Sequence, residues 1–245
     1  MDEVVHRLDA SDDEVGSSTL ETMALARRYN AWQVARIAPY LGRRICEVGA
    51  GIGNISALLV KRAPELLVLT DQDPYYLKRL RKRFAGLPGV SVDALTLPDD
   101  GARERFLQHR IDTVIALNVL EHIPDDRGAL QSMRDMLISG GRVVVLVPAM
   151  RALYGSLDKG LGHVRRYDAG ALRRLFDDAD LLIDRVFFFN MVGALGWFAN
   201  SRLLGVARIP KSQVQWFDRL VPCLRAEDFL PRPFGQSLIA VGVRA

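Results

Sequence analysis

Cysteine is scarce in this chain, which has only Cys46 and Cys223 among its 245 residues. Two cysteines so far apart exclude a disulfide framework and a cysteine-based metal site, since both need several cysteines at short spacings. The acidic residues near the N-terminus also do not fit the basic and then apolar pattern of a secretory signal. We therefore expect a cytoplasmic protein with no metal site.

Long apolar runs and strings of aromatic residues are lacking as well. The uncharged stretch at residues 186–201 is shorter than the roughly 20 apolar residues that a membrane-spanning helix needs. Aromatic residues make up 8% of the chain and do not alternate with Lys, as they would in a groove that stacks single-stranded nucleic acid. We therefore expect no nucleic-acid partner, and the balance of 49% apolar and 25% charged residues is that of a globular protein.

Positive charge is distributed unevenly along the chain. Residues 1–150 contain 19 Lys and Arg against 20 Asp and Glu, whereas residues 151–245 contain 14 against 9. A solvated basic surface accounts for this excess. An anionic acceptor molecule or an anionic membrane surface near the C-terminal half accounts for it equally well.

The most informative segment is residues 45–54, which read ICEVGAGIGN. An apolar strand leads through Glu47 into three alternating glycines, where the backbone can turn sharply and approach a ligand without a Cβ in the way. A dinucleotide-binding loop would place its third glycine at position 54, where this chain has Asn54, and Glu47 would repel a diphosphate. A carboxylate at this place suits a ligand that carries an ammonium group.

Three motifs, in this order along the chain, resemble those of class I S-adenosylmethionine-dependent methyltransferases. The first motif of that family, acidic-x-Gly-x-Gly-x-Gly, is matched by Glu47, Gly49, Gly51 and Gly53. The second is Asp71, at the end of the apolar run at residues 66–70. The third is IDTVIALNVLEHIP at residues 111–124, which together with residues 140–148 is similar to the fourth and fifth strands of the family. The resemblance covers residues 29–148.

The resemblance implies S-adenosylmethionine as the cofactor, with S-adenosylhomocysteine as the product. It assigns the methionine end to Glu47 and the ribose hydroxyls to Asp71. The adenine contact is expected at Thr96 or, in a shifted alignment, at Asp93. Tyr29 either closes over the cofactor or packs in the core. The expected cofactor residues are Tyr29, Glu47, Gly49, Ala50, Gly51, Gly53, Asp71, Gln72, Leu95, Thr96, Leu117 and Asn118.

Alternating strand and helix patterns predict a single α/β domain at residues 19–245, after a mobile acidic N-terminus at residues 1–18. Strands are expected at residues 44–48, 66–70, 90–95, 112–117, 142–147, 182–189 and 236–243. Helices are expected at about residues 18–40, 54–62, 74–85, 101–108, 126–139 and 168–179. The resemblance then implies a doubly wound, Rossmann-like sheet of seven mostly parallel strands, with the last strand antiparallel.

About 45 residues separate the last two predicted strands, far more than a hairpin loop needs. We expect this insertion, residues 190–235, to form helices bounded by prolines that pack over the carboxyl edge of the sheet. Four large aromatic side chains are expected to face inward, against the acceptor cavity or a second subunit: Trp197, Phe198, Trp216 and Phe217. The uncharged stretch is favoured as a strand and a buried helix, and three other uses stay open, namely a lid over the acceptor, a homodimer interface and a peripheral membrane contact.

Histidine is the natural general base, and His163 and His122 are the two candidates. His163 belongs to LDKGLGHVRRY at residues 157–167, which follow the fifth strand where this fold opens toward an acceptor. We expect His163 to act as general base or to orient the acceptor. The expected acceptor contacts are Arg165, Arg166, Tyr167 and Trp197. A structural interpretation stays open, in which the arginines are solvated, the tyrosine is packed and His122 is bonded to backbone.

The resemblance thus implies a methyltransferase that moves a methyl group by in-line displacement to a small-molecule acceptor, such as a natural product, a sugar or a lipid-linked intermediate. A group of bacterial methyltransferases of unassigned acceptor looks similar through residues 157–167 and the insertion. A second hypothesis is a protein on the same fold that binds the cofactor without methylating, as a cyclase or a partner-binding scaffold. A nicotinamide dehydrogenase is disfavoured by Glu47 and Asn54.

Overall fold

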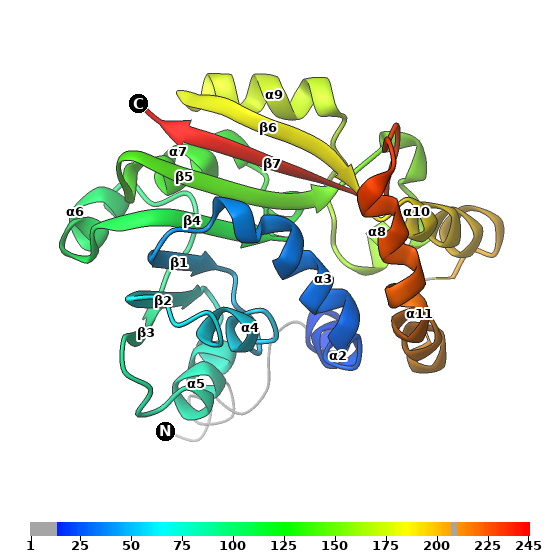
Figure 1. Cartoon of the computed structure of the whole chain (residues 1–245), viewed down its shortest axis with the longest axis horizontal. Coiled ribbons are helices and arrows are strands. Elements are labelled where there is room, and N and C mark those ends of the chain that lie inside the picture. The colour runs from blue at the N-terminus through cyan, green and yellow to red at the C-terminus, as the bar shows by residue number, and fades with distance from the viewer. Residues whose placement is uncertain (1–13, 207–209) are drawn as a thin grey trace.

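The computed structural model describes residues 14–206 and 210–245, in which a seven-stranded sheet lies between two layers of helices (Figure 1). The strands are β1 (Arg44–Val48), β2 (Leu66–Asp71), β3 (Val90–Ala94), β4 (Ile111–Leu117), β5 (Leu137–Pro148), β6 (Leu181–Phe189) and β7 (Ser237–Arg244). The α-helices are α2 (Glu14–Met23), α3 (Arg27–Ile37), α4 (Ser56–Val60), α5 (Pro74–Arg83), α6 (Ala102–Phe106), α7 (Asp126–Asp135), α8 (Ser156–Gly160), α9 (Ala169–Asp178), α10 (Met191–Phe198) and α11 (Lys211–Leu224).

The strands lie in the order β3-β2-β1-β4-β5-β7-β6. Strands β1 to β5 pair in parallel, and β7 runs antiparallel to both β5 and β6. This arrangement confirms the fold class expected from the sequence. The chain adds β2 and β3 on one side of β1, and then adds β4 and β5 on the other side. In doubly wound folds, the carboxyl ends of the strands at such a switch point form the ligand crevice.

Side chains of the central strands alternate between two hydrophobic cores. On β5, Val143, Val145 and Val147 belong to the core that α6, α7 and α9 cover, whereas Val144 and Leu146 belong to the core beneath α3, α4 and α11. All five are fully buried. Each such side chain contributes roughly 1.5–3 kcal/mol of hydrophobic stabilisation. A strand buried on both faces reads as a continuous apolar run, which is why this strand is evident in the sequence.

Strand β5 begins five residues earlier than expected, and α7 accordingly ends at Asp135 instead of near residue 139. Leu137 already pairs with Ile111, and the register then shifts before Thr113 pairs with Arg142. Gly140 lies in this bulge with a φ of 75°, which glycine adopts without strain. A Gly-Gly pair reads as a turn in the sequence, and this is why the bulged part of the strand was not predicted.

The single helix predicted at residues 18–40 is two helices and a terminal turn in the structure. Helix α2 ends at Met23, and α3 begins at Arg27. The Asn30 side chain donates a hydrogen bond of 3.0 Å to the Met23 carbonyl, which also accepts the Ala26 N–H at 3.1 Å, and so joins the two helices across the break. Helix α2 starts at Glu14, within the segment expected to be mobile, and residues 1–13 of that segment lie outside the described residues.

The insertion between β6 and β7 lies at one end of the molecule (Figure 1). It consists of α10, a π-helical turn (Ala199–Leu203), α11 and a 3-10 turn (Arg225–Phe229). Glu227 joins the two ends of the insertion, since its carboxylate accepts the backbone N–H groups of Asn190 and Met191, directly after β6, at 2.7 and 2.8 Å. Within the described part of the chain, no helix is long and apolar enough to cross a membrane.

The four large aromatic side chains of the insertion do not all face inward. Trp197 is buried, and Phe217 packs against the core under α3. Phe198 and Trp216 are instead 42% and 64% exposed. These two residues therefore do not face the interior of the chain. Which faces of α10 and α11 are buried depends on the elements that pack against them and not on the local sequence pattern.

Candidate active site

The loop from β1 to α4 holds its three glycines in left-handed backbone conformations. Gly49, Gly51 and Gly53 have φ angles of 68°, 54° and 80°. A Cβ atom at Gly49 would lie 2.7 Å from the Val119 side chain, and one at Gly53 would lie 2.6 Å from the Phe84 ring. Both the backbone conformation and the available space therefore require glycine here.

Helix α2 lies against this glycine loop. A Cβ atom at Gly51 would lie 2.9 Å from the Leu20 side chain, and the Asn54 side chain donates a hydrogen bond to the Leu20 carbonyl at 3.1 Å. On the other side, the backbone N–H of buried Ala50 donates to the Thr70 carbonyl at 2.9 Å. The loop is thus held between α2 and the end of β2.

Glu47, at the carboxyl end of β1, is buried with a carboxyl oxygen, Oε2, that has no hydrogen-bond partner. Burial raises the pKa of Glu47 to about 8, and Asp71 adds to this effect, while Ser56 and Arg83 oppose it. An unpaired polar group away from water is unfavourable. An ammonium group at this point would pair with the carboxylate, so the observed surroundings of Glu47 fit the ligand inferred from the sequence.

Asp71 ends β2 beside the glycine loop. Its Oδ2 accepts the N–H of Gly51 at 2.8 Å, and its Oδ1 accepts the N–H of Asp73 at 3.0 Å. Burial raises the pKa of Asp71, and these backbone bonds counteract the rise. Each carboxylate oxygen keeps a second lone pair, which leaves acceptors for ribose hydroxyls. Gln72 is exposed next to it, and the Asp73 side chain caps α5 by accepting the Tyr75 N–H.

The two alternatives for the adenine contact differ in their surroundings. A cavity of about 420 Å³ follows β3, and its walls include Leu95 and Thr96. Leu95 is buried, and Thr96 is exposed. Asp93 lies within β3 opposite Thr70 and does not line this cavity. Thr96 thus lines a cavity and Asp93 does not, and both alternatives for the adenine contact stay predictions.

The remaining expected cofactor residues fall into different settings. Leu117 is half-buried at the end of β4, and the exposed Asn118 follows it with a φ of 57°. Tyr29 packs in an aromatic cluster, with its ring centroid 5.8 Å from that of Phe189 and 5.7 Å from that of Phe217. Burial raises the pKa of Tyr29 to about 12. The packed alternative is thus the observed one for Tyr29.

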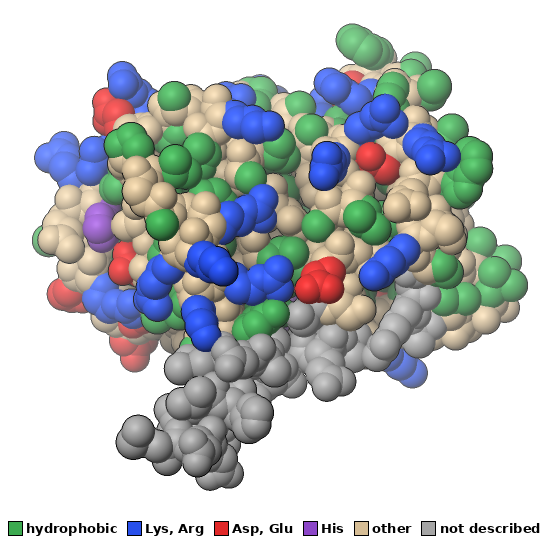
Figure 2. Space-filling model, turned by 90° about the horizontal axis from the view of Figure 1, so that it is seen from below, with side chains coloured by type: hydrophobic (Ala, Val, Ile, Leu, Met, Phe, Trp, Pro, Cys, Tyr) green, Lys and Arg blue, Asp and Glu red, His purple; other side chains and the backbone are tan. Residues whose placement is uncertain are grey.

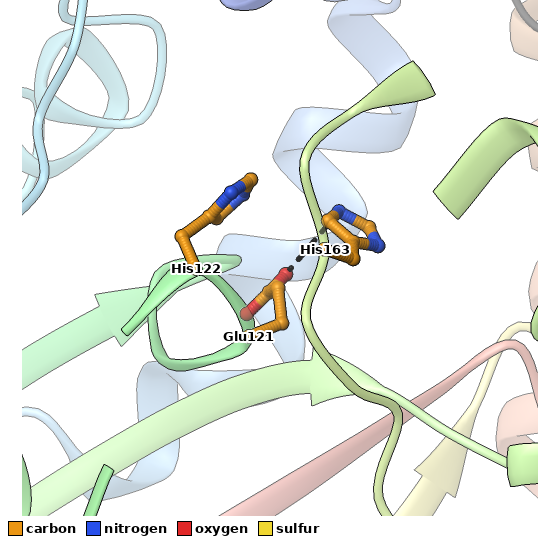
Figure 3. Close-up of side chains that lie close together, drawn as sticks. All are labelled: Glu121, His122 and His163. Atoms are coloured by element: carbon orange, nitrogen blue, oxygen red, sulfur yellow. Dashed lines mark ion pairs between the residues drawn. The ribbon is translucent and has the colours of Figure 1, made fainter. Parts of the chain in front are cut away.

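A cluster of titratable side chains forms where the turn after β4 meets the loop after α8. Glu121 and His122 come from the turn Leu120–His122, and His163 comes from the opposite loop (Figure 3). His163 Nε2 lies 3.9 Å from Glu121 Oε1, and the two imidazole rings are 4.9 Å apart in a T-shaped contact. Glu121 is fully buried with both carboxyl oxygens unpartnered, and burial raises its pKa to about 8.

Asp158 orients His163. Its Oδ1 lies 3.0 Å from His163 Nδ1 and accepts the Nε–H of Arg166 at 2.7 Å. Its Oδ2 accepts the Trp197 indole N–H at 3.2 Å. Burial alone would raise the pKa of Asp158, but the bonds from His163 and Arg166 outweigh burial and hold the pKa below its usual value. Asp158 is therefore an ionised acceptor. In the neutral tautomer of His163 that donates to it, Nδ1 carries the hydrogen and Nε2 carries the lone pair.

Three of the four expected acceptor contacts have internal roles in the structure. The Arg166 side chain is fully buried between Asp158 and the Ala149 carbonyl, and its guanidinium lies 4.7 Å from the Trp197 ring centroid. Trp197 is committed to the same Asp158. The Tyr167 hydroxyl donates to Asp126 at 2.9 Å. An acceptor contact by these residues stays a prediction, since Arg166 and Tyr167 line a cavity of about 380 Å³ and Arg166 Nη2 has no hydrogen-bond partner.

Arg165 is the basic side chain of this loop that keeps an exposed surface. It pairs with Asp126, donates to the Pro124 carbonyl at 2.7 Å and is 33% exposed. It lines a cavity of about 380 Å³ together with Arg151 and Tyr154. His163 does not line this cavity, so His163 and Arg165 do not share a cavity although they lie on the same loop.

Glu121, His122 and His163 also form the one group of potential metal ligands found among residues 14–206 and 210–245. One ligand atom from each lies within 4.8 Å of the other two. A zinc ion with bonds of about 2.0–2.1 Å brings its ligand atoms to roughly 3.3 Å from one another. The cluster would have to contract to hold such an ion, and Arg166 already supplies a positive charge near Glu121.

Sequence reasoning missed Glu121 and Asp158. Glu121 lies in the third motif but is not among the expected site residues, although a carboxylate directly before His122 and near the cofactor is a usable signal. Asp158 lies five residues before His163 and eight before Arg166. That spacing matches no regular helix or strand period, and the contact depends on the loop conformation.

Comparisons with known proteins agree with this geometry. Residues 46–143 match the family model described as a methyltransferase domain. An uncharacterised methyltransferase of Mycobacterium sp. (strain KMS) is 25% identical over 225 residues, which cover 89% of this chain and 86% of that protein.

Among solved structures, two neighbours share the fold. One is a chain from the complex between the Haloferax volcanii Trm112 methyltransferase activator and a methyltransferase, with a TM-score of 0.60, 18% identity and 93% of each chain covered. The other is the [4+2]-cyclase SpnF, with a TM-score of 0.57, 15% identity and coverage of 89% of this chain and 80% of that chain. The chain is thus similar to methyltransferase domains over residues 46–143, where the glycine loop, Glu47 and Asp71 lie, and it shares the fold of these solved structures.

Proposed function

We propose that this chain transfers a methyl group from S-adenosylmethionine to a hydroxyl or amino group of a small-molecule acceptor, whose proton is taken by His163. The observation that carries the proposal is the Asp158–His163 pair at 3.0 Å, on the loop opposite the turn after β4. When bound, the cofactor supplies an electrophilic methyl group on a sulfonium. The unpaired carboxyl oxygen of Glu47 supports an ammonium group, and the fixed carboxylate of Asp71 supports a ribose.

His163 works in this proposal through its Nε2 lone pair. Asp158 holds the Nδ1–H, so Nε2 can accept the acceptor's proton as the new bond to carbon forms. The ionised Asp158 then stabilises the imidazolium, as the aspartate of a Ser-His-Asp catalytic triad does for its histidine. Arg166 and Trp197 position Asp158 and take no part in the proton transfer.

The second candidate function is cofactor binding without methylation. The likeness to the SpnF cyclase supports it at the level of the fold. Both functions require the glycine loop, Glu47 and Asp71. In methyl transfer His163 accepts a proton from the acceptor, whereas in binding without transfer it does not. Conversion of the cofactor to S-adenosylhomocysteine in the presence of an acceptor therefore distinguishes the two functions.

Replacing Asp71 by alanine is expected to weaken binding of S-adenosylhomocysteine by about 1–3 kcal/mol, because charge-assisted bonds to the ribose are lost. Isothermal titration calorimetry measures this change against a micromolar dissociation constant expected for the natural protein, about −8 kcal/mol. Asp184→Ala, an exposed aspartate on β6, is the matched control and should bind as the natural protein does. Equal binding by both variants would show that Asp71 is not the ribose carboxylate.

Chelation of divalent metal is expected to leave methyl transfer unchanged. Proton transfer to His163 needs no cation, and the cluster of Glu121, His122 and His163 is wider than a zinc site. The measurement is turnover after dialysis against EDTA, with and without added zinc, manganese or magnesium. Loss of turnover that one of these ions restores would contradict the proton-transfer mechanism and assign the cluster to a metal.

A further inference from the structure

Exposed apolar side chains are concentrated on the outer surface of the insertion. Nine of the fifteen exposed large hydrophobic residues in the described part of the chain lie there. They are Val192, Leu195, Phe198, Leu203, Leu204, Trp216, Leu220, Phe229 and Leu230. Phe229 is 91% exposed, and Leu203 and Leu204 are each 70% exposed. We call this set the insertion surface, and such a concentration marks a contact with another apolar body.

Charges of opposite sign are segregated between the two sides of the insertion. All three of its acidic residues are turned inward. Asp218 accepts the Tyr29 N–H, Glu227 accepts the Asn190 and Met191 N–H groups, and Asp228 accepts the Trp32 indole N–H. Arg232 is the basic residue that joins them, 3.5 Å from Asp228. Four basic side chains are exposed, namely Arg202, Lys211, Arg219 and Arg225, of which Arg225 also lies 3.9 Å from Asp228.

Helix α11 shows how one element separates these two sides. Val214 and Val221 are buried against the core under α3, and Asp218 lies between them. Trp216 and Leu220, four residues apart, lie on the outward face and are 64% and 52% exposed. The Arg219 guanidinium lies 5.1 Å from the Trp216 ring centroid. The outward face therefore carries an aromatic ring, an aliphatic side chain and a cation together.

Hydrophobic and basic side chains also lie intermingled at this end of the molecule in the space-filling view (Figure 2). From this combination we propose that the insertion surface binds the surface of an anionic lipid bilayer, with its apolar side chains among the lipid head groups and its arginines on lipid phosphates. An amphipathic helical surface with Trp, Leu and Arg has the chemistry of a monotopic contact. Each basic residue near an anionic bilayer adds an attraction that salt weakens.

A second copy of the chain fits this surface less well. In a two-fold symmetric dimer, the same patch meets itself. The exposed arginines of one copy would then face those of the other, while the acidic residues of the insertion are buried or engaged on the inner side. Anionic lipid phosphates supply the missing opposite charge, so the observed segregation favours a membrane over a homodimer.

Tryptophan fluorescence provides a selective test, since the chain has three tryptophans and only Trp216 is exposed. Trp32 and Trp197 are 0% and 8% exposed. Vesicles of phosphatidylcholine mixed with phosphatidylglycerol should shift the emission to shorter wavelength and carry the protein upward in flotation. Pure phosphatidylcholine vesicles should do neither. The Trp216→Phe variant should lose the spectral shift but still float.

Paired variants test the two components of the contact. Arg219→Glu with Arg225→Glu should lower the partition coefficient on anionic vesicles at least about tenfold, whereas Arg81→Glu on α5 should leave it unchanged. Leu220→Ser with Phe229→Ser should also abolish flotation, and Leu107→Ser, at an equally exposed site elsewhere, should not. All these side chains are at the surface, and cofactor binding by calorimetry confirms that each variant is folded.

Two outcomes would overturn the proposal. One is the absence of flotation and of a spectral shift on anionic vesicles. The other is a dimer in size-exclusion chromatography that Trp216→Ser or Leu220→Ser dissociates, which would make the insertion surface an interface between copies. Neither outcome bears on methyl transfer, since cofactor binding and turnover are measured without vesicles.

Discussion

Replacing His163 by alanine is expected to lower the turnover number about 10²- to 10⁴-fold, with cofactor affinity unchanged. The variant loses the Nε2 lone pair that accepts the acceptor's proton, and a positioned general base contributes an effect of this size. It keeps Glu47, Asp71 and the glycine loop, so binding of S-adenosylhomocysteine should not change. Steady-state turnover and calorimetry measure the two quantities separately.

The Asp158→Asn variant distinguishes a base from a structural histidine. An amide can also hold His163 in place, but it no longer stabilises the imidazolium. Turnover should therefore fall, and the rise of turnover with pH should shift to lower pH. His122→Ala, in the neighbouring ring, is the matched control and should retain most of the turnover. If His163→Ala keeps full turnover, or if its loss of turnover is matched by a loss of folded protein, His163 is not the base.

Replacing Glu47 by glutamine is expected to weaken cofactor binding about ten- to hundredfold at pH 8.5, because a charge-assisted bond to the ammonium group becomes a neutral one. The effect should depend on pH. The pKa of Glu47 is raised to about 8, so the carboxyl group must lose a proton to bind the cofactor at lower pH. Below pH 8, the cofactor affinity of the natural protein should therefore increase by up to about tenfold for each unit by which the pH rises. The affinity of the Glu47→Gln variant should not change with pH.

The same raised pKa predicts the pH dependence of stability without cofactor. A group whose pKa is higher in the folded than in the unfolded state stabilises the fold below its unfolded pKa and loses this contribution as the pH rises. For Glu47 this window extends from pH 4.5 to about 8. The melting temperature of the natural protein should fall across it more steeply than that of Glu47→Gln. Parallel melting curves, together with pH-independent affinity, would show that Glu47 does not face the ammonium group.

The parts of this structure that the sequence predicts are those whose pattern is local. Strand β5 is a run of valines because both of its faces are buried, and the glycine loop is evident because three left-handed residues leave no alternative to glycine. The position of Asp71 beside the glycine loop could be predicted because Asp71 ends β2, which pairs in parallel with β1. In each case a few neighbouring residues carry the whole signal.

The parts that the sequence did not predict depend on contacts between distant residues. Trp197 meets Asp158 across 39 positions, and Arg166 binds that same carboxylate, so both side chains are buried in this structure. The orientation of Trp216 depends on which face of α11 packs against α3. An arginine in a loop or an aromatic residue on a short helix has the same local pattern whether it is buried or exposed.

The most direct test of the account is transfer of a labelled methyl group. The purified protein would be incubated with S-adenosylmethionine labelled in its methyl group and with the small-molecule and lipid fractions of a bacterial extract. We predict that label enters a product in the natural protein, that S-adenosylhomocysteine appears in equal amount, and that His163→Ala loses at least about 99% of this transfer. Tight binding of the cofactor with no label transferred in any fraction would contradict the account and favour a protein that binds the cofactor without methylating.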